Sequence, residues 1–228
     1  MDFNKIFKEG ADARVEEIIK TIPINWDVHA HGVFNLIKYF EPEFKISEQQ
    51  KKLLKQLLLY FTGNNHFEGS LSKGLLLTGS VGSGKTLFLE KVFKTYTSEE
   101  LKVNSFIPFN FKDIAESYKT EGENAFMPIK AKRHETFRER MVVSPVLIDD
   151  LGAGDFILTN FGNKVNLIDK IINVRYLVYS RFRKLTHATT NLYVSDFKKH
   201  CDERTVSRMS EMFNIIELQD NDYRKIKL

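Results

Sequence analysis

The stretch GSVGSGKT, residues 79–86, constrains the fold of this 228-residue chain more than any other feature. It fits the pattern G-x-x-x-x-G-K-[ST] at every fixed position. Glycines at 79, 82 and 84 let the backbone curl until successive N–H groups point at one anion. The apolar run GLLLTG precedes the motif, and the amphipathic stretch TLFLEKVFKTY follows. A strand, a glycine-rich turn and a helix in this order predict a phosphate-binding loop on an α/β sheet.

Two residues at the end of this motif have expected contacts with a bound nucleotide. Lys85 is expected to reach the β- and γ-phosphates, and the Thr86 hydroxyl is placed to ligate Mg²⁺. The residues expected to surround the phosphates are Gly79, Ser80, Val81, Gly82, Ser83, Gly84, Lys85 and Thr86.

A second feature is acidic: LIDDLG at 147–152 places two aspartates at the end of an apolar strand. Burying a carboxylate is costly unless a partner stabilises it, and two adjacent carboxylates repel each other. Asp149 is therefore expected to face the phosphates and bind Mg²⁺ directly or through water. Asp150 either polarises an attacking water or caps the turn before Leu151 and Gly152; spacing alone does not separate these roles.

Strand and helix patterns alternate along most of the chain. A capping box at Ser47–Gln50 opens the periodic helix KKLLKQLLLYF. Alternation predicts a mostly parallel sheet covered on both faces, with ligands at the carboxyl ends of the strands. The strands are expected at 74–79, 103–109, 145–149, 184–189 and 213–218, and the helices at about 85–96, 111–119, 126–141, 164–182 and 203–212.

Polar residues beyond the acidic strand narrow the choice of chemistry. The run ATTNL ends its strand at Asn191, whose amide is suited to hold a water or to contact the γ-phosphate. Arg204 and Arg208 lie one helical turn apart and share a face. A small-molecule kinase has no need for this amide or for the paired arginines.

The succession GSVGSGKT, VLIDDLG, NVRY, ATTNL, ERTVSRM and DYR resembles the AAA+ ATPases of the bacterial helicase-loader group, of the DnaC/DnaI type. It is similar also to IstB-type transposition helpers. The resemblance covers about residues 45–228. It implies an AAA+ domain with a five-stranded parallel sheet, behind a short helical extension at 1–44 that would dock a partner. It also implies ATP and Mg²⁺ as cofactors and assembly into rings or filaments.

The resemblance further implies roles for single residues. Lys85 and Thr86 match the Walker A pair, and Asp149 and Asp150 match the Walker B pair. Asn191 matches sensor 1, Arg204 the arginine finger offered to a neighbour, with Arg208 as a second candidate, and Arg224 the nucleotide-contacting sensor 2.

The function expected from this resemblance is an ATP-hydrolysing protein that assembles on single-stranded DNA and loads or remodels a replicative helicase. One alternative is a transposition helper that acts on duplex DNA with a transposase. Another is an adaptor in which ATP orders an interface without being hydrolysed.

The segment IKAKRHETFRER, 129–140, is expected to lie on the helix at 126–141 and to face single-stranded DNA. Phe126 and Phe137 could stack on bases there. A solvated basic helix face is an equal alternative. Arg175, in line with Ile168 and Ile172, either reaches across a subunit boundary or extends out of the core edge.

Composition agrees with an ordinary globular protein. The net charge of +4 permits a nucleic-acid partner, and a single cysteine, Cys201, indicates a reducing compartment. The charged first residues do not form a signal peptide, and no apolar run is long enough to cross a membrane. A cytoplasmic protein without membrane association is the expectation.

Overall fold

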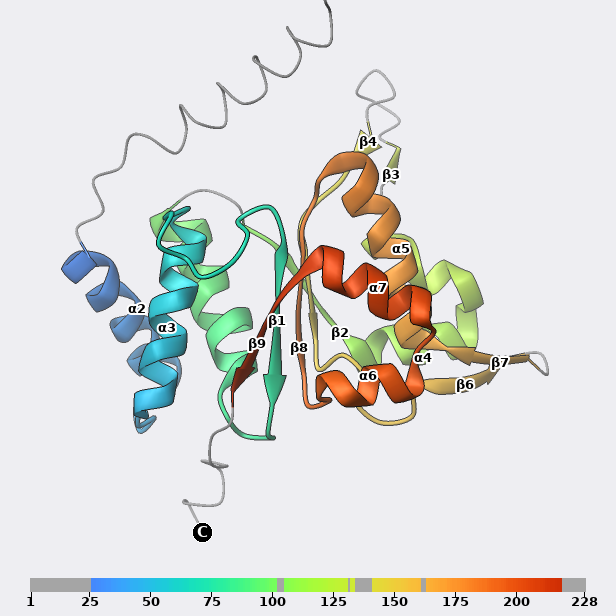
Figure 1. Cartoon of the computed structure of the whole chain (residues 1–228), viewed down its shortest axis with the longest axis horizontal. Helices are drawn as coiled ribbons and strands as arrows, with labels where there is room; N and C mark the ends of the chain where they lie inside the picture. Colours follow the sequence, from blue (N-terminus) through green and yellow to red (C-terminus); the bar gives the residue numbers. More distant parts are fainter. Residues whose placement is uncertain (1–25, 102–104, 131, 134–140, 161–162, 219–228) are drawn as a thin grey trace, which may run out of the picture.

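In the computed structural model of this chain, a parallel sheet lies between two layers of helices (Figure 1). The structure describes residues 26–101, 105–130, 132–133, 141–160 and 163–218. The expected α/β class with a parallel five-stranded sheet is confirmed. Across the sheet the order is β2 (Ile107–Asn110), β5 (Val146–Asp149), β8 (Thr186–Thr190), β1 (Gly74–Gly79) and β9 (Phe213–Leu218).

The three central strands, β5, β8 and β1, are buried on both faces, because successive side chains point to opposite sides and helices cover each side. Leu75 and Leu77 of β1 pack toward α2 (Trp26–Phe40), α3 (Glu48–Phe61) and η1 (Leu87–Phe93). Leu76 packs on the other face, toward α4 (Phe111–Glu121), α5 (Leu167–Phe182) and α7 (Glu203–Met212). Two-sided burial explains why β1 and β5 read as nearly continuous apolar runs.

The helix expected after the phosphate-binding loop is present. It begins directly after the loop, and the Phe88 N–H donates to the Gly84 carbonyl at 2.9 Å. Its backbone has wide π-type turns over η1 and again over η2 (Tyr96–Glu100). Short π segments are frequent near functional sites.

The helix expected over 126–141 is wrong. A 3₁₀ helix, η3 (Gly122–Ile129), ends the helical part, and β3 (Lys132–Arg133) then pairs antiparallel with β4 (Met141–Val142). Pro128 lacks the N–H that would continue an α-helix. Phe126 is fully buried and cannot stack on a base. Residues 131 and 134–140, with Phe137, lie outside the described residues.

A second hairpin corrects the helix expected over 164–182. β6 (Ile157–Asn160) and β7 (Asn163–Asn166) pair antiparallel, so that α5 begins at Leu167. The Asn166 side chain sets this start, because its Oδ1 accepts the N–H of Ile168 at 3.0 Å. A short helix, α6 (Val194–His200), then joins β8 to α7.

Arg175 of α5 takes neither of its expected positions, because its side chain is only 1% exposed. Its guanidinium donates to the carbonyl oxygens of Ile129 at 2.7 Å and Leu185 at 3.0 Å, and to the Thr186 hydroxyl at 2.9 Å. Burial lowers its pKa to about 10. Leu185 directly precedes β8, so Arg175 ties α5 and η3 to the amino edge of the sheet.

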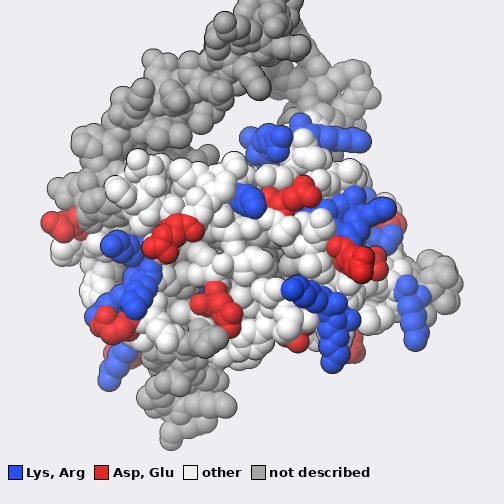
Figure 2. Space-filling view, in the orientation of Figure 1, with Lys and Arg blue, Asp and Glu red and all other residues white. Residues whose placement is uncertain are grey.

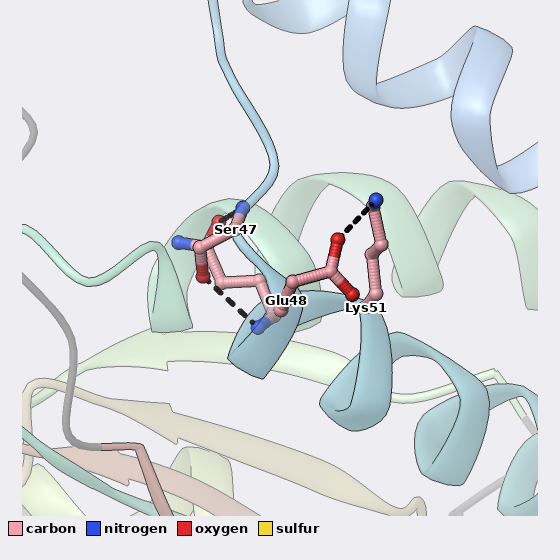
Figure 3. A network of polar contacts seen from close by, with 4 residues as sticks. Ser47, Glu48 and Lys51 are labelled. Carbon is pink, nitrogen blue, oxygen red and sulfur yellow. Dashed lines mark hydrogen bonds and ion pairs between the residues drawn. The ribbon is translucent and has the colours of Figure 1, made fainter.

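The amino-terminal helices belong to the packed structure. Val33 and Ile37 of α2 lie in the same apolar core as Leu57 of α3. The capping box expected at Ser47 is present (Figure 3). A domain boundary at residue 44 stays a prediction. Among the described residues, no helix combines the length and apolar character that crossing a bilayer requires.

Candidate nucleotide-binding site

The phosphate-binding loop follows β1 at the carboxyl edge of the sheet, at the bottom of Figure 1. Gly79, Gly82 and Gly84 have φ angles of 141°, 79° and 95°, a region that favours glycine. A Cβ atom on Gly79 would lie 2.0 Å from the Leu218 carbonyl oxygen of β9. Any side chain at residue 79 would therefore force β1 and β9 apart.

Lys85 lies inside this loop and is 5% exposed. Its Nζ donates to the carbonyl oxygens of Gly79 at 3.0 Å and Ser80 at 2.7 Å, and to Asn191 Oδ1 at 2.9 Å. These neutral acceptors hold the ammonium group at the mouth of the loop, where a phosphate oxygen can replace some of them.

Asp149 ends β5 and is 4% exposed. Its Oδ1 accepts hydrogen bonds from the hydroxyls of Thr86 at 3.0 Å and Thr189 at 2.6 Å. Burial raises the pKa of Asp149, whereas these two hydrogen bonds act to lower it. The structure thus brings the two expected Mg²⁺ ligands, Thr86 and Asp149, into direct contact.

The oxygen atoms at this contact fit Mg²⁺. Magnesium prefers hard oxygen ligands and usually keeps several waters, so one or two side chains and the phosphates suffice. The described residues contain no cluster of three or more His, Cys, Asp or Glu side chains that would form an all-protein metal cage. Thr86 and Asp149 are the residues that would hold the ion.

Asp150 lies in a tight turn with φ of 53°, in the left-handed region. Its N–H donates to Thr189 Oγ1 at 2.9 Å, and its carbonyl accepts the Ala153 N–H at 2.9 Å. The turn is closed by the backbone, and no described residue donates a hydrogen bond to the Asp150 carboxylate. This half-buried carboxylate is free for another contact.

Thr189 is a site residue that sequence reasoning missed. It is fully buried, and its hydroxyl donates to Asp149 while accepting from Asp150 N–H. One side chain thus positions both acidic residues. The signal was the paired threonine in ATTNL, since a hydroxyl at the end of a buried strand needs polar partners.

Glu90 was also missed. It follows Thr86 by four residues and therefore shares its helix face. Burial and then the negative charge of Asp149 raise the pKa of Glu90. The carboxylates near the loop thus create a negative potential that a cation would relieve.

Asn191 follows β8, which lies between β1 and β5. This position places its amide between the phosphate-binding loop and the acidic strand end. Two threonine hydroxyls fix the chain around the end of β8. Thr78 donates to the Leu192 carbonyl, and Thr190 donates to the Leu151 carbonyl at 2.7 Å. Asn191 Oδ1 accepts a hydrogen bond from Lys85 Nζ at 2.9 Å, so the amide lies beside the ammonium group of the loop.

The two arginines of α7 have different surroundings. Arg208 donates to Asn173 Oδ1, and its guanidinium lies 4.7 Å from the centre of the Tyr176 ring. Arg204 is exposed and makes no hydrogen bond or ion pair with any other described residue. Arg208 therefore fixes α7 on α5, while Arg204 is available to a partner. Arg224 lies outside the described residues.

These features define a class of protein. A glycine-rich loop with a buried lysine, an acidic strand end in contact with the loop threonine, and an amide between them are the features expected of a nucleotide-binding site on a P-loop α/β fold.

Comparison with known proteins places this fold more narrowly. No family model and no curated protein matches the sequence. The solved structure of DnaI has a TM-score of 0.55 at 17% identity, covering 79% of this chain and 88% of that one. The DnaC helicase loader has a TM-score of 0.51 at 21% identity, covering 78% and 94%. A protein described as a primosome component of Streptococcus pyogenes serotype M3 has a TM-score of 0.52 at 17% identity, covering 75% and 80%.

These likenesses establish the fold. The chain has the AAA+ form of the P-loop α/β fold. The expected resemblance to the DnaC/DnaI type is thereby confirmed at the level of the fold.

Proposed function

We propose that this protein is a cytoplasmic, Mg²⁺-dependent ATPase that assembles on DNA and loads or remodels a partner such as a replicative helicase. The observation that carries the proposal is the meeting of three elements at one edge of the sheet. Lys85 Nζ lies 2.9 Å from Asn191 Oδ1, and Thr86 Oγ1 lies 3.0 Å from Asp149 Oδ1. ATP bound by the loop would place its γ-phosphate among these groups.

Nucleotide binding would rearrange the hydrogen bonds of Lys85. Its ammonium group would exchange loop carbonyls for β- and γ-phosphate oxygens, which gives stronger, charge-assisted bonds. Thr86 and Asp149 would hold Mg²⁺, which neutralises charge on the phosphate oxygens. We assign Arg224 a contact with the same nucleotide, as the resemblance implies.

Hydrolysis would use the groups around the γ-phosphate. The free carboxylate of Asp150 would accept the proton of the attacking water, and Asn191 would orient that water. Arg204 of a neighbouring copy would stabilise the transition state, an effect worth ~10³-fold or more when an arginine is supplied in trans. Such an arrangement makes hydrolysis conditional on assembly.

The proposed partner follows from the neighbours in fold. The structures that this chain resembles are described as a helicase loader and a primosome component. These descriptions support a role in DNA replication. On the face shown in Figure 2, Lys and Arg side chains are interspersed with Asp and Glu. Contacts with DNA phosphates would therefore be local, which agrees with the modest net charge.

The test of the ATPase compares two aspartates of the same turn region. Asp150→Asn is expected to lower ATP hydrolysis ~10²-fold or more while ATP still binds, because it removes the proton acceptor. Asp155→Asn changes an exposed aspartate nearby and should leave the rate unchanged. Normal ATP hydrolysis by Asp150→Asn would remove Asp150 from the proposed role, whereas no hydrolysis by the unmodified protein in the presence of Mg²⁺ and DNA would support the non-hydrolysing adaptor.

The same assay separates the two DNA-acting proposals. Stimulation by single-stranded DNA above duplex DNA supports the loader. Equal or greater stimulation by duplex DNA overturns it in favour of the transposition helper.

A further inference from the structure

Gln50 connects the amino-terminal part of the chain to the phosphate-binding loop. It is fully buried although it lies in the first turn of α3. Its Oε1 accepts the N–H of Ser47 at 3.0 Å, and its Nε2 donates to the backbone carbonyl of Ser83 at 2.9 Å. The first contact closes the capping box, and the second crosses to the loop, 33 residues along the chain.

The helix start has a buried side and a solvent side. Figure 3 shows Ser47 at the entry of α3 and the ion pair between Glu48 and Lys51, whose atoms are 2.6 Å apart. That pair is exposed and stabilises the helix little. Gln50 instead reaches the loop from the buried side, so its side chain has a use beyond helix capping.

The carbonyl that Gln50 holds belongs to the same peptide unit as the Gly84 N–H. None of the described peptide bonds is cis. In a trans peptide the C=O and the following N–H point in opposite directions. Fixing the Ser83 carbonyl toward α3 therefore directs the Gly84 N–H away from α3, toward the side where the loop receives phosphates.

This peptide needs such a restraint. Gly84 has φ of 95° and no side chain, so the peptide before it can rotate at little cost. Ser83 is fully buried, and its hydroxyl donates to the Ser80 carbonyl at 2.8 Å. Phe44 also closes over this point, 3.2 Å from the position a Gly84 Cβ would take. The loop is thus supported from the segment that precedes and opens α3.

We propose that Gln50 is a positioning residue for the phosphate cradle, holding the Ser83–Gly84 peptide so that the Gly84 N–H faces a bound di- or triphosphate. The assignment rests on the proposed nucleotide binding and lies outside the Walker motifs. It makes α3 part of the nucleotide site, so that whatever moves α3 also changes phosphate affinity.

The experiment measures the affinity for ADP and the concentration of pyrophosphate that displaces it. Pyrophosphate has no base or ribose, so it reports on the phosphate-binding loop alone. Gln50→Met removes both polar contacts at similar volume and should weaken both ligands roughly 10- to 100-fold, since a hydrogen bond to a charged group is lost. Ser47→Ala is the matched control, because it removes the hydroxyl that accepts the Gln50 N–H at 3.2 Å and spares the contact with Ser83. It should leave both affinities within about threefold, with a similar small loss of thermal stability.

A second variant keeps the test valid if Gln50→Met does not fold. Gln50→Glu keeps an oxygen for the Ser47 N–H, but its carboxylate cannot donate to the Ser83 carbonyl, so the same loss is expected. Unchanged ADP affinity in a folded Gln50 variant, or an equal loss in Ser47→Ala, overturns the inference. Absence of ADP binding by the unmodified protein would instead overturn the proposed function.

Discussion

Thr189 places one hydroxyl group between two carboxylates that would otherwise repel each other. The Thr189 hydroxyl donates a hydrogen bond to the Asp149 carboxylate and accepts one from the backbone N–H of Asp150. The hydroxyl has one donor and room to accept, so both contacts are satisfied at once. The left-handed backbone of Asp150 is held by this contact and by the turn that follows.

We expect Thr189→Val to raise the Mg²⁺ concentration needed for half-maximal ATP hydrolysis by roughly tenfold. The substitution keeps the shape but removes a hydrogen bond to a charged group, which contributes about 1.5–3 kcal/mol. Thr189→Ser should restore the wild-type value. Thr190→Val, which removes a buried hydroxyl bonded to the Leu151 carbonyl, should lower stability without changing the Mg²⁺ dependence. An unaltered Mg²⁺ titration in Thr189→Val would contradict this role.

At this scale the sequence was informative where a motif fixes the spacing. The strand-end position of Asp149 and the loop positions of Lys85 and Thr86 predicted side chains that the structure brings together. Thr189 could not be found in this way, because a threonine in a buried strand resembles any β-branched residue. Its role depends on the pairing of β8 with β5, which is not local in sequence.

The elements show which physical signals are strong. The strands and the long amphipathic helices were predicted because burial on one or both faces leaves a periodic pattern. The segment 130–140 fails this rule, since it is rich in charges and only Ala131 and Phe137 in it are apolar. Its local pattern could not distinguish a basic helix from a short hairpin.

Strand β8 also carries a titratable group inside the core. His187 contacts the rings of Tyr60, Phe61 and Phe106, and its Nδ1 accepts the Leu75 N–H at 3.2 Å. Burial, and secondarily the positive charge of Arg175, lowers its pKa from 6.5 to about 3. His187 is therefore neutral at physiological pH.

This shift makes stability depend on pH. Below its unfolded pKa of about 6.5, His187 binds a proton in the unfolded state but not in the folded one, so stability falls as the pH decreases toward about 3. At pH 5 the loss amounts to about 2 kcal/mol. His187→Asn keeps an acceptor without titrating, and urea unfolding at pH 7.5 and pH 5 should show a smaller difference for it. Equal differences in both proteins would refute the assignment.

At the scale of the whole molecule, the proposed catalytic arrangement requires a second copy of the chain. The loop, Asp149 and Asn191 lie together, whereas Arg204 is exposed and makes no hydrogen bond or ion pair with the described residues of its own chain. Arg208, the second candidate from the sequence, is held on α5 by Asn173 and Tyr176. Spacing could not make this distinction, because both arginines share one helix face.

Mixing two inactive variants tests whether Arg204 acts in trans. Lys85→Ala and Arg204→Ala should each lose ATP hydrolysis ~10³-fold, since they remove a phosphate contact and a transition-state charge. In an equal mixture about one quarter of the interfaces combine an intact loop with an intact Arg204, so activity should return in that proportion. Arg208→Ala serves as the control. It keeps Arg204 and is expected to lower the stability of the protein rather than to remove the trans-acting charge. No recovery at any protein concentration would exclude Arg204 as the trans-acting residue.

The buried guanidinium of Arg175 restrains the amino edge of the sheet, where the strands begin, more than the carboxyl edge, where they end. At the amino edge, the buried guanidinium donates to the main-chain oxygens of residues that precede β5 and β8 and that end η3. At the opposite edge, the proposed function requires Lys85 to change partners and a metal ion to bind and leave with each nucleotide. We therefore expect the amino edge to stay fixed while the carboxyl edge moves. Each round of nucleotide exchange should move the loop, α6 and the Asp150 turn, while hydrogen exchange at the start of β5 and β8 stays slow throughout.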